Sequence, residues 1–485
     1  MQIVLSARRT ALVASFGAMC LALSGCGGGS STPAPVTPPV QTAPTLTSSL
    51  SPSVIENTAG VFYTATASDP QNDPITITLY SGPDADKLVL DAAGGLRFNR
   101  APNFDLPIDA NRDNIYEITL RVTAGGESRD FAVRVSVSND RERVIVRRAA
   151  TGFVDPVAIA QIVGQPTLLI AERSGRVLRF DQTNDAVTED TYIRDRKLPG
   201  EILAIGYAFP GHPTQRGVYM VTHSPATGLL LQAFDEGRSA FGTVKLADAW
   251  SRATTVSFIY QPRVLLAIGS PTESEAQDAA SGYGKLIELQ QSDPFAGASL
   301  RDPGDMVLRP TVIGDGIQRP GGFSLGGAFS ILADRGTSRQ HELTSFRPEW
   351  RPLDFGWPFY EGSFATRANA PAAINGPNVV YPFGTGRKEG EGIIAGQFFN
   401  SAFDPAFGDS YVFFDVNGSI FMLPSSAFTN GFINTSDMIE DKTQDFVPNL
   451  GQINRIVGYG AGVASTFFYL LDADGELFEI SQQQP

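Results

Sequence analysis

The stretch LDADGELFEI at residues 471–480 joins two apolar runs through a short polar turn that contains Gly475. The stretch AERSGRVLRF at residues 171–180 has the same form, with Gly175 in its turn. Two apolar runs joined by a polar turn with glycine are typical of a β-hairpin. A chain that repeats such a hairpin at regular spacing is expected to consist of repeated β units.

The hairpin recurs four more times between these two copies. Successive turn glycines lie 53, 56, 52, 82 and 57 residues apart, and the one long interval holds an insertion at about residues 354–375. A period in the fifties fits four-stranded propeller blades with long loops. Two β-sandwiches built from the same strands would not explain the regular spacing. The sequence therefore predicts an all-β protein with a six-bladed β-propeller over residues 141–485, whose turn glycines are Gly175, Gly228, Gly284, Gly336, Gly418 and Gly475.

A second β unit is expected before the propeller. Residues 46–140 alternate short β-branched and aromatic runs with turn clusters about every ten residues, as in YEITLRV at residues 116–122. Alternation of apolar and polar residues is the pattern of half-buried strands, and this spacing of turns predicts a β-sandwich.

The first 45 residues are expected to be a targeting signal and a linker. Residues 1–25 read as a secretory signal, with two arginines before an apolar run too short to span a bilayer. The signal ends in LSGC at residues 23–26, which resembles the bacterial lipoprotein box, where cleavage precedes a lipidated cysteine. An ordinary signal with a chance cysteine is the alternative. Residues 26–45 then form a Gly/Ser/Pro-rich linker. We expect an exported protein, lipid-anchored to the membrane through Cys26; Gly27 after it favours the outer membrane of a bacterial envelope.

Composition excludes several classes of protein. The chain has 485 residues, with 37 Lys and Arg against 51 Asp and Glu and a net charge of −14. An acidic chain lacks the basic face that nucleic acids or anionic lipid surfaces require, so no nucleic acid is expected as a partner. Both cysteines, Cys20 and Cys26, lie at the N-terminus. Disulfides, zinc fingers and cysteine nucleophiles are therefore excluded for the rest of the chain.

Acidic motifs of the predicted sandwich follow an order that resembles a cadherin repeat, closest to the bacterial cadherin-like variants. The motifs are EN at residues 56–57, DPQNDP at 69–74, NFD at 103–105 and ND at 139–140. The resemblance implies an adhesion module that binds Ca²⁺, an ion that prefers six to eight oxygen ligands. Two departures are the absent first linker aspartate and the absent second repeat, and solvated Asx turns are the alternative. The Ca²⁺ candidates are Glu56, Asp69, Asp73, Asp105 and Asp140.

The propeller region resembles the glucose/sorbosone dehydrogenase family. Its matching stretches include GFVDPVAIA at residues 152–160, LLIAERSGR at 168–176 and DFGWPFYEG at 354–362. The resemblance implies a six-bladed propeller and, as one alternative function, a sugar or aldehyde dehydrogenase that uses pyrroloquinoline quinone (PQQ).

The positions that carry activity in that family differ here. The stretch from Trp250 to Ser257 lacks the expected histidine base, and Ser270 stands where the family has aspartate. In GIQRP at residues 316–320 the family's arginine is replaced or displaced by one position, and Asp415 lies where basic residues are expected. None of the three histidines, His212, His223 and His341, has the sequence context of a base. Catalytic residues are therefore unassigned.

The main functional hypothesis is an envelope protein whose propeller binds carbohydrate or another envelope ligand, with eroded catalysis. The enzyme is the alternative, and a structural protein that docks a partner protein is a third. Arginine suits the binding of carboxylates, and aromatic rings suit stacking on sugars. The same residue types are also common as surface charge and as packing between blades. The candidate ligand-binding residues are Arg252, Gln318, Arg319, Trp357 and Tyr360.

Overall fold

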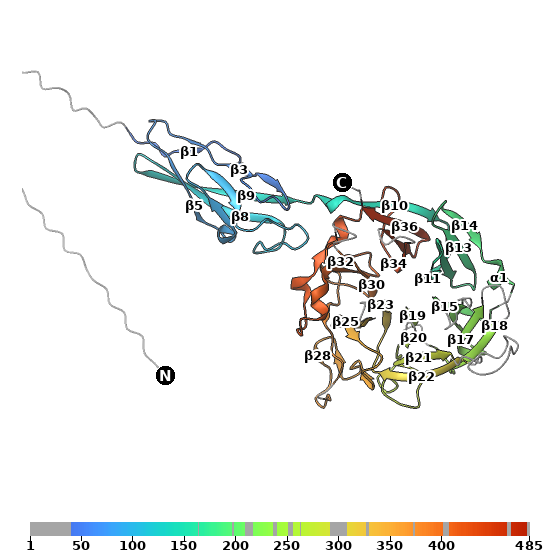
Figure 1. Ribbon diagram of the computed structural model, residues 1–485. Coiled ribbons are helices and arrows are strands. Elements are labelled where there is room, and N and C mark those ends of the chain that lie inside the picture. Colours follow the sequence, from blue (N-terminus) through green and yellow to red (C-terminus); the bar gives the residue numbers. More distant parts are fainter. Residues whose placement is uncertain are drawn as a thin grey trace, which may run out of the picture.

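The computed structural model describes residues 40–482, with gaps at 163, 196–197, 209–216, 236–239, 251–255, 262, 292–307, 326–328, 372–373, 401–406 and 463–466. Cys26 and most of the linker lie outside the described residues, as do Arg252 and His212. Two β units follow one another along the chain, a small N-terminal module and a ring of sheets (Figure 1).

The N-terminal module packs two main sheets around one apolar core. In the strand of residues 115–124, every second side chain is buried, which is the predicted alternation. The first sheet has the order β2 (Ser53–Ile55), β9 (Glu127–Ser138), β8 (Ile115–Ala124), β5 (Thr76–Ser81). The second has the order β3 (Tyr63–Thr64), β7 (Gly95–Phe98), β6 (Leu88–Leu90), and β1 (Thr45–Leu46) pairs with β4 (Ala67–Ser68).

Six sheets, each with four antiparallel strands, form the ring, which confirms the predicted propeller. Blade one contains β11 (Pro156–Gln161), β12 (Thr167–Glu172), β13 (Val177–Asp181) and β14 (Ala186–Glu189). Blade two contains β15 (Glu201–Ala208), β16 (Gly217–Ser224), β17 (Gly228–Asp235) and β18 (Ala240–Ala247). Blade three contains β19 (Val256–Gln261), β20 (Arg263–Ile268), β21 (Lys285–Gln291) and β22 (Leu308–Asp315), with β26 (Leu353–Asp354) as a fifth strand.

The remaining blades follow the same order. Blade four contains β23 (Pro320–Leu325), β24 (Ser330–Asp334), β25 (Gln340–Phe346) and β29 (Val379–Pro382). Blade five contains β30 (Ile393–Phe398), β31 (Ser410–Asp415), β32 (Ile420–Pro424) and β33 (Glu440–Asp441). Blade six contains β34 (Ile456–Ala461), β35 (Phe467–Asp472) and β36 (Glu476–Gln482), and its fourth strand is β10 (Val144–Thr151).

Strand β10 closes the ring. It pairs with β36 in antiparallel register, from Val144 opposite Gln482 to Thr151 opposite Glu476. The last blade is thus made from both ends of the propeller sequence (Figure 1). This closure removes the sheet edge that an open array of blades would expose.

Five of the six predicted turn glycines lie between the second and third strands of their blades, and Gly228 is the first residue of the third strand of blade two. Five of them have φ between +69° and +99°, a conformation that strongly favours glycine. Gly336 is the exception: a Cβ there would lie 1.9 Å from the carbonyl oxygen of Gln340, so space and not φ requires glycine. The predicted insertion lies between β25 and β29 of blade four and includes β26, β27 (Tyr360–Glu361) and β28 (Phe364–Ala365).

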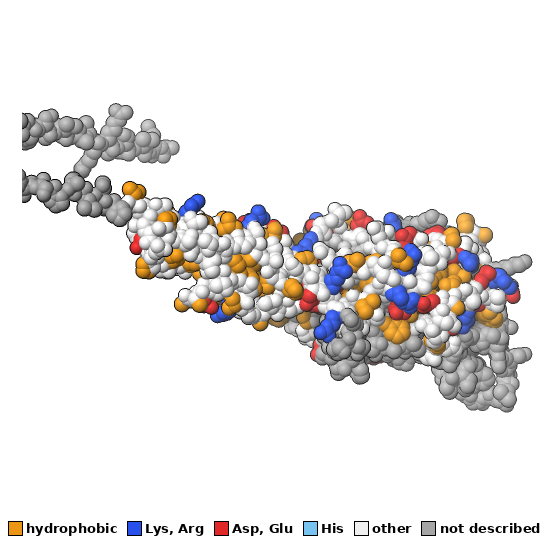
Figure 2. Space-filling view, turned by 90° about the horizontal axis from the view of Figure 1, so that it is seen from above, with side chains coloured by type: hydrophobic (Ala, Val, Ile, Leu, Met, Phe, Trp, Pro, Cys, Tyr) orange, Lys and Arg blue, Asp and Glu red, His pale blue; other side chains and the backbone are white. Residues whose placement is uncertain are grey.

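Short helical segments complete the structure: α1 (Thr191–Arg194), η1 (Ala85–Lys87), η2 (Arg141–Arg143), η4 (Ser425–Phe428), η5 (Ser436–Met438) and η6 (Lys442–Gln444). None of the helices in the described ranges combines the length and apolar character that crossing a bilayer requires. Seen from above, the module continues directly into one side of the propeller, and charged and apolar side chains are mixed on the visible face (Figure 2).

Candidate functional site

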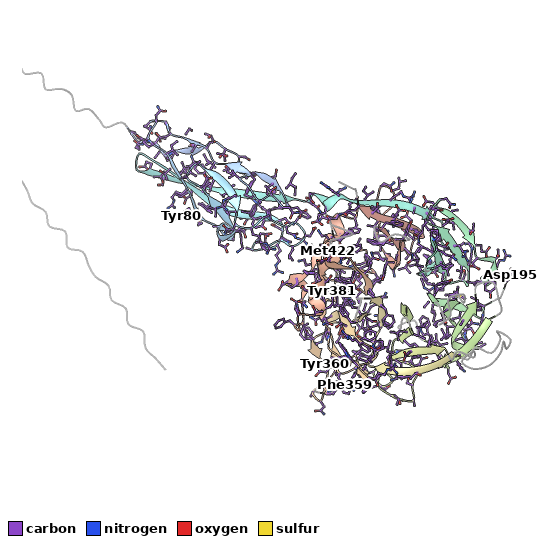
Figure 3. All side chains as sticks on the ribbon, in the orientation of Figure 1. Tyr80, Asp195, Phe359, Tyr360, Tyr381 and Met422 are labelled. Atoms are coloured by element: carbon purple, nitrogen blue, oxygen red, sulfur yellow. The ribbon has the colours of Figure 1, made fainter. Side chains whose placement is uncertain are left out.

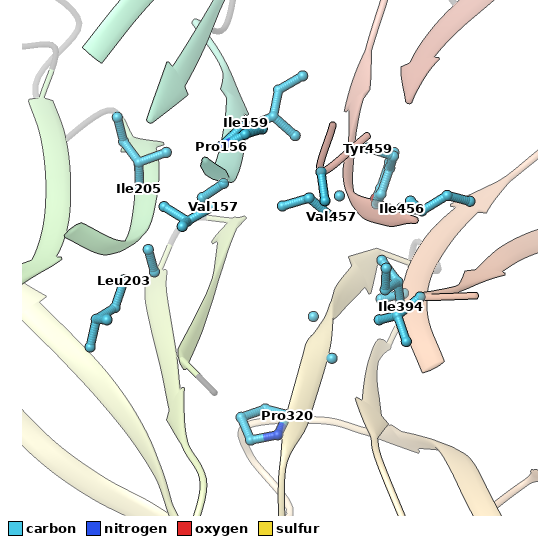
Figure 4. Close-up of a pocket in the computed structure, with 18 of the residues that line it drawn as sticks. Pro156, Val157, Ile159, Leu203, Ile205, Pro320, Ile394, Ile456, Val457 and Tyr459 are labelled. Atoms are coloured by element: carbon cyan, nitrogen blue, oxygen red, sulfur yellow. The ribbon is translucent and has the colours of Figure 1, made fainter. Parts of the chain in front are cut away.

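A cavity of about 920 Å³ lies at the axis of the propeller, and its described lining comes mainly from the first strands of five blades, β11, β15, β23, β30 and β34. Many of the side chains along its wall are apolar, and they include Ile159, Leu203, Ile394, Val457 and Tyr459 (Figure 4). We call this cavity the central channel. An apolar wall with a few polar groups is the usual composition of a small-molecule site.

In four of the six blades, one acidic residue fixes the backbone at the mouth of the channel. We call this residue the cap of its blade. Each ends the second strand of its blade, and its carboxylate accepts hydrogen bonds from backbone N–H groups just before the first strand. Asp472 accepts from Asn454 at 2.8 Å and from Arg455 at 2.9 Å. Glu172 accepts from the backbone N–H of Val154. Asp334 accepts from those of Gln318 and Arg319. Asp415 accepts from those of Glu391 and Gly392.

This role explains Asp415, which stands where the family resemblance led us to expect a basic residue. Its side chain is fully buried, accepts the Tyr381 hydroxyl at 2.6 Å and accepts the Asn417 backbone N–H at 3.1 Å. Burial also requires this many partners, because an unpaired carboxylate inside a protein is costly. Asp415 therefore holds the backbone of blade five in place.

Replacing Asp415 by alanine is expected to lower the free energy of unfolding by about 3 kcal/mol or more, because four donors, two of them buried, lose their acceptor. Thermal and denaturant unfolding would measure this loss. Glu273→Gln is the matched control: Glu273 is largely exposed and paired only with Arg367, so its loss should cost about 0–1 kcal/mol. Equal stability of the two variants would contradict the structural role of Asp415.

The caps determine which residues face the channel. In all four of these blades the residue after the cap lines the channel, and in three of them the residue directly before the first strand does so too. Four of the lining residues are arginines and two are acidic, so the mouth carries an excess of positive charge in an acidic protein. They are Arg173, Arg319, Arg335 and Arg455, with Asp155 and Glu391.

Two of these arginines, Arg319 and Arg335, lie close enough for their like charges to repel each other. Burial and the neighbouring charge of Arg319 lower the pKa of Arg335 to about 10. The Nε of Arg335 donates to the carbonyl oxygen of Ile393 at 3.0 Å, whereas the buried Nε of Arg319 has no hydrogen-bond partner among the described residues. Two adjacent guanidinium groups with unused donors are suited to binding an anion.

A second polar cluster lies at blades one and two. Arg173 forms ion pairs with Asp155 at 2.9 Å and with Glu201 at 3.7 Å. Glu201 also lies 3.5 Å from Nδ1 of His223, whose ring is 5.7 Å from that of Trp250. Trp250 lines the channel, and its buried Nε1 has no partner within the described part of the chain. His223 itself is not among the described lining residues.

The two histidines that the structure describes both lie within the strand and turn structure of their blades. His223 occupies in blade two the position that the acidic cap occupies elsewhere, because it pairs with the first residue of β15. His341 is fully buried: its Nδ1 accepts the Gly336 N–H, so its Nε2 donates to the carbonyl oxygen of Gly390 at 2.9 Å. Burial lowers the pKa of His341. The channel therefore has no histidine among its described lining residues.

Of the four predicted ligand-binding residues that the structure describes, only Arg319 lies on the channel, and Arg252 is outside the described residues. Gln318, Trp357 and Tyr360 instead surround a small cavity of about 10 Å³, room for about one water. The Tyr360 hydroxyl donates to the carbonyl oxygen of Pro371, and Figure 3 shows Tyr360 toward the outer edge of the ring. The sequence analysis missed Arg173, Arg335 and Arg455. Only their position could have pointed to two of them, since Arg173 and Arg335 directly follow Glu172 and Asp334, the acidic residues that end the second strands of their blades.

The five predicted Ca²⁺ ligands do not form one site. Asp69 and Asp73 lie at the start of β5, next to the β8–β9 hairpin, whereas Glu56 and Asp105 lie at the end near the propeller. The ten-residue strand β8 separates the two ends by about 30 Å. Glu56 and Asp105 instead approach Glu142, with one oxygen of each within 4.8 Å of the others.

No family model and no curated protein sequence matches this chain. Solved structures with a similar fold include the soluble aldose sugar dehydrogenase from Escherichia coli in its apo form, at 16% identity and a TM-score of 0.49, with 70% of this chain and 100% of that one covered. A glucose dehydrogenase has 17% identity and a TM-score of 0.48, covering 70% and 99%. The PQQ domain of pyranose dehydrogenase from Coprinopsis cinerea, in its holo form, has 14% identity and a TM-score of 0.47, covering 70% and 95%. Similarity at this level indicates neither activity nor ligand.

Proposed function

We propose that this protein is an exported, lipid-anchored binding protein whose propeller holds an acidic carbohydrate or a related envelope ligand in its central channel. The observation that carries the proposal is the pair Arg319 and Arg335, two close guanidinium groups on a cavity of about 920 Å³. An anion between them would relieve their repulsion and pair the free Nε of Arg319.

The channel wall narrows the class of ligand. Side chains such as Leu203, Ile394 and Tyr459 offer apolar contact below a cationic mouth. A uronic-acid sugar matches this arrangement, because its ring has apolar C–H faces and its carboxylate can pair with arginine. A neutral sugar would bring no charged acceptor to the unpartnered Nε of Arg319.

Anchoring would place this site in the envelope. A lipid on Cys26 and the linker of residues 26–45 would tether the N-terminal module, and the module would hold the propeller away from the bilayer. The linker has the composition of a flexible, extended chain.

A PQQ-dependent sugar or aldehyde dehydrogenase is the second candidate, because the same arginines could pair with the carboxylates of the quinone. Arg319, Arg335 and Arg455 would be its partners in the channel. The bound quinone would supply the hydride acceptor. No histidine that could act as the base is among the described lining residues: His223 is oriented by Glu201 but packs against Trp250 without lining the channel. The binding function therefore has the stronger support.

Titration of the chain from Gly27 onward with oligogalacturonate is expected to change the fluorescence of Trp250, which lines the channel. Neutral oligosaccharides should have little effect, and added salt should weaken the response. The double variant Trp350→Phe/Trp357→Phe should keep the signal, because neither residue lines the channel. Loss of the signal in this variant would place the ligand at the small cavity of blade four. Quinone that co-purifies and reduces a dye with aldoses would establish the enzyme instead.

A further inference from the structure

The N-terminal module meets the propeller at a short junction. Strand β9 ends at Ser138 and β10 begins at Val144, so five residues join the two units. Lys442 of blade five lies at this junction, in the turn η6 after β33. Its side chain is 1% exposed, although lysine is rarely buried unless its charge is paired.

Carboxylates from both units surround the Lys442 ammonium. Its Nζ lies 2.6 Å from Oδ2 of Asp105 in the module and 2.6 Å from Oε2 of Glu142 in the connecting segment. Asp445 and Glu440 of the propeller follow at 3.4 and 3.7 Å. These four carboxylates keep the ammonium charged and raise the pKa of Lys442 despite its burial.

The ammonium contacts two of the three carboxylates that approach each other closely enough to share a metal ion, which are Glu56, Asp105 and Glu142. Ca²⁺ would need the same oxygens and several more, and its charge would be repelled by Lys442. Glu56 is already engaged, since it accepts the backbone N–H groups of Phe104 at 2.8 Å and Asp140 at 3.1 Å. The residues present therefore do not fit Ca²⁺ while Lys442 is in place.

Further hydrogen bonds cross the junction around this cluster. Asn139 donates to Asp445 at 2.6 Å, and Asn103 donates to Glu440 at 3.1 Å. The guanidinium of Arg387 donates to the carbonyl oxygens of Phe104 at 3.0 Å and of Arg112 at 3.1 Å. Several partners on each side restrict both bending and twisting at the junction.

We infer that Lys442 supplies an internal cation in place of a divalent metal at this junction, so that the module and the propeller form one rigid unit without Ca²⁺. Removal of the ammonium would leave Glu56, Asp105 and Glu142 close together without a counter-charge. The freed oxygens could then bind a divalent ion. A single substitution is thus expected to convert a metal-independent junction into a Ca²⁺-dependent one.

Distance measurements between spin labels can test this inference in the chain from Gly27 onward. No cysteine follows Cys26, so Glu127→Cys on the β8–β9 hairpin and Glu273→Cys on the propeller give specific labels. The parent protein is expected to show a narrow distance distribution that neither excess EDTA nor millimolar Ca²⁺ changes. With Lys442→Met the distribution should broaden in EDTA and narrow again with Ca²⁺, and calorimetry should show at least tenfold tighter Ca²⁺ binding than in the parent.

Lys245→Met is the matched control, because Lys245 pairs with a single aspartate at a partly exposed site. If Lys442→Met does not fold, Glu142→Gln offers a milder change at a carboxylate that is 22% exposed, and it should broaden the distribution without metal. Broadening of the parent distribution by EDTA, or an unchanged narrow distribution in a folded Lys442→Met protein, would overturn the inference.

Discussion

Replacing both Arg319 and Arg335 by glutamine is expected to weaken binding of an acidic oligosaccharide roughly 100-fold or more. Each charge-assisted hydrogen bond contributes about 1.5–3 kcal/mol, and two such groups face the same part of the channel. The substitution removes the repulsion between the two guanidinium groups and also their attraction to the buried carboxylates of Asp334 and Asp415, so the stability of the free protein is measured as well. Fluorescence or calorimetric titration at low and high salt would measure the loss.

The matched control for this variant is Arg97→Gln, an exposed arginine of the N-terminal module. The control should bind the acidic oligosaccharide as tightly as the parent protein. In the double variant, the remaining affinity should no longer depend on the salt concentration. Thermal melting must be followed in parallel, because Arg335 also donates to the carbonyl oxygen of Ile393. A stable double variant that binds the ligand with undiminished affinity would show that the channel is not the anion site.

Deletion of β10 is expected to abolish folding of the propeller, whereas deletion of the N-terminal module alone should not. The two truncated proteins to compare begin at residue 152 and at residue 141. The shorter one loses Val144–Thr151, whose pairing with β36 closes the ring. It also loses Val146, which is 3% exposed and packs with Phe478 and Ile480 in the core of blade six.

Loss of a whole strand from the closing blade should exceed the 5–15 kcal/mol that typically stabilise a domain. Size-exclusion chromatography and circular dichroism during heating would compare the two proteins. The one beginning at residue 141 should be soluble and should melt cooperatively, with some loss from the missing contacts of Lys442. A cooperative, monomeric protein beginning at residue 152 would contradict the closure of the ring by β10.

Local patterns predicted most of the architecture. Hairpins with a turn glycine recur at regular spacing, and all six of these glycines lie in equivalent turns. The insertion after Gly336 lies outside the four-stranded repeat, as its spacing indicated. Such features are readable because strand alternation and turn geometry depend on residues within a few positions of each other.

Local patterns predicted the candidate site poorly. The resemblance to a dehydrogenase family drew attention to Trp357 and Tyr360, but these residues surround a small cavity of blade four. Asp415 resembled a lost catalytic position, but its carboxylate accepts backbone hydrogen bonds at the mouth of its blade. A residue that ends a strand can be a cap or a ligand-binding group, and its sequence neighbours do not distinguish the two roles.

The sequence by itself determined the repeating unit of this protein: four-stranded blades, their turn glycines and an alternating β unit before them. Only the tertiary structure decided which charges meet. Closure of the ring brings Arg319, Arg335 and Arg455 to one channel, and the junction buries Lys442 against Asp105, 337 positions away in the chain. The physical reason is range: strands follow from neighbouring residues, whereas electrostatic partners depend on how distant segments pack.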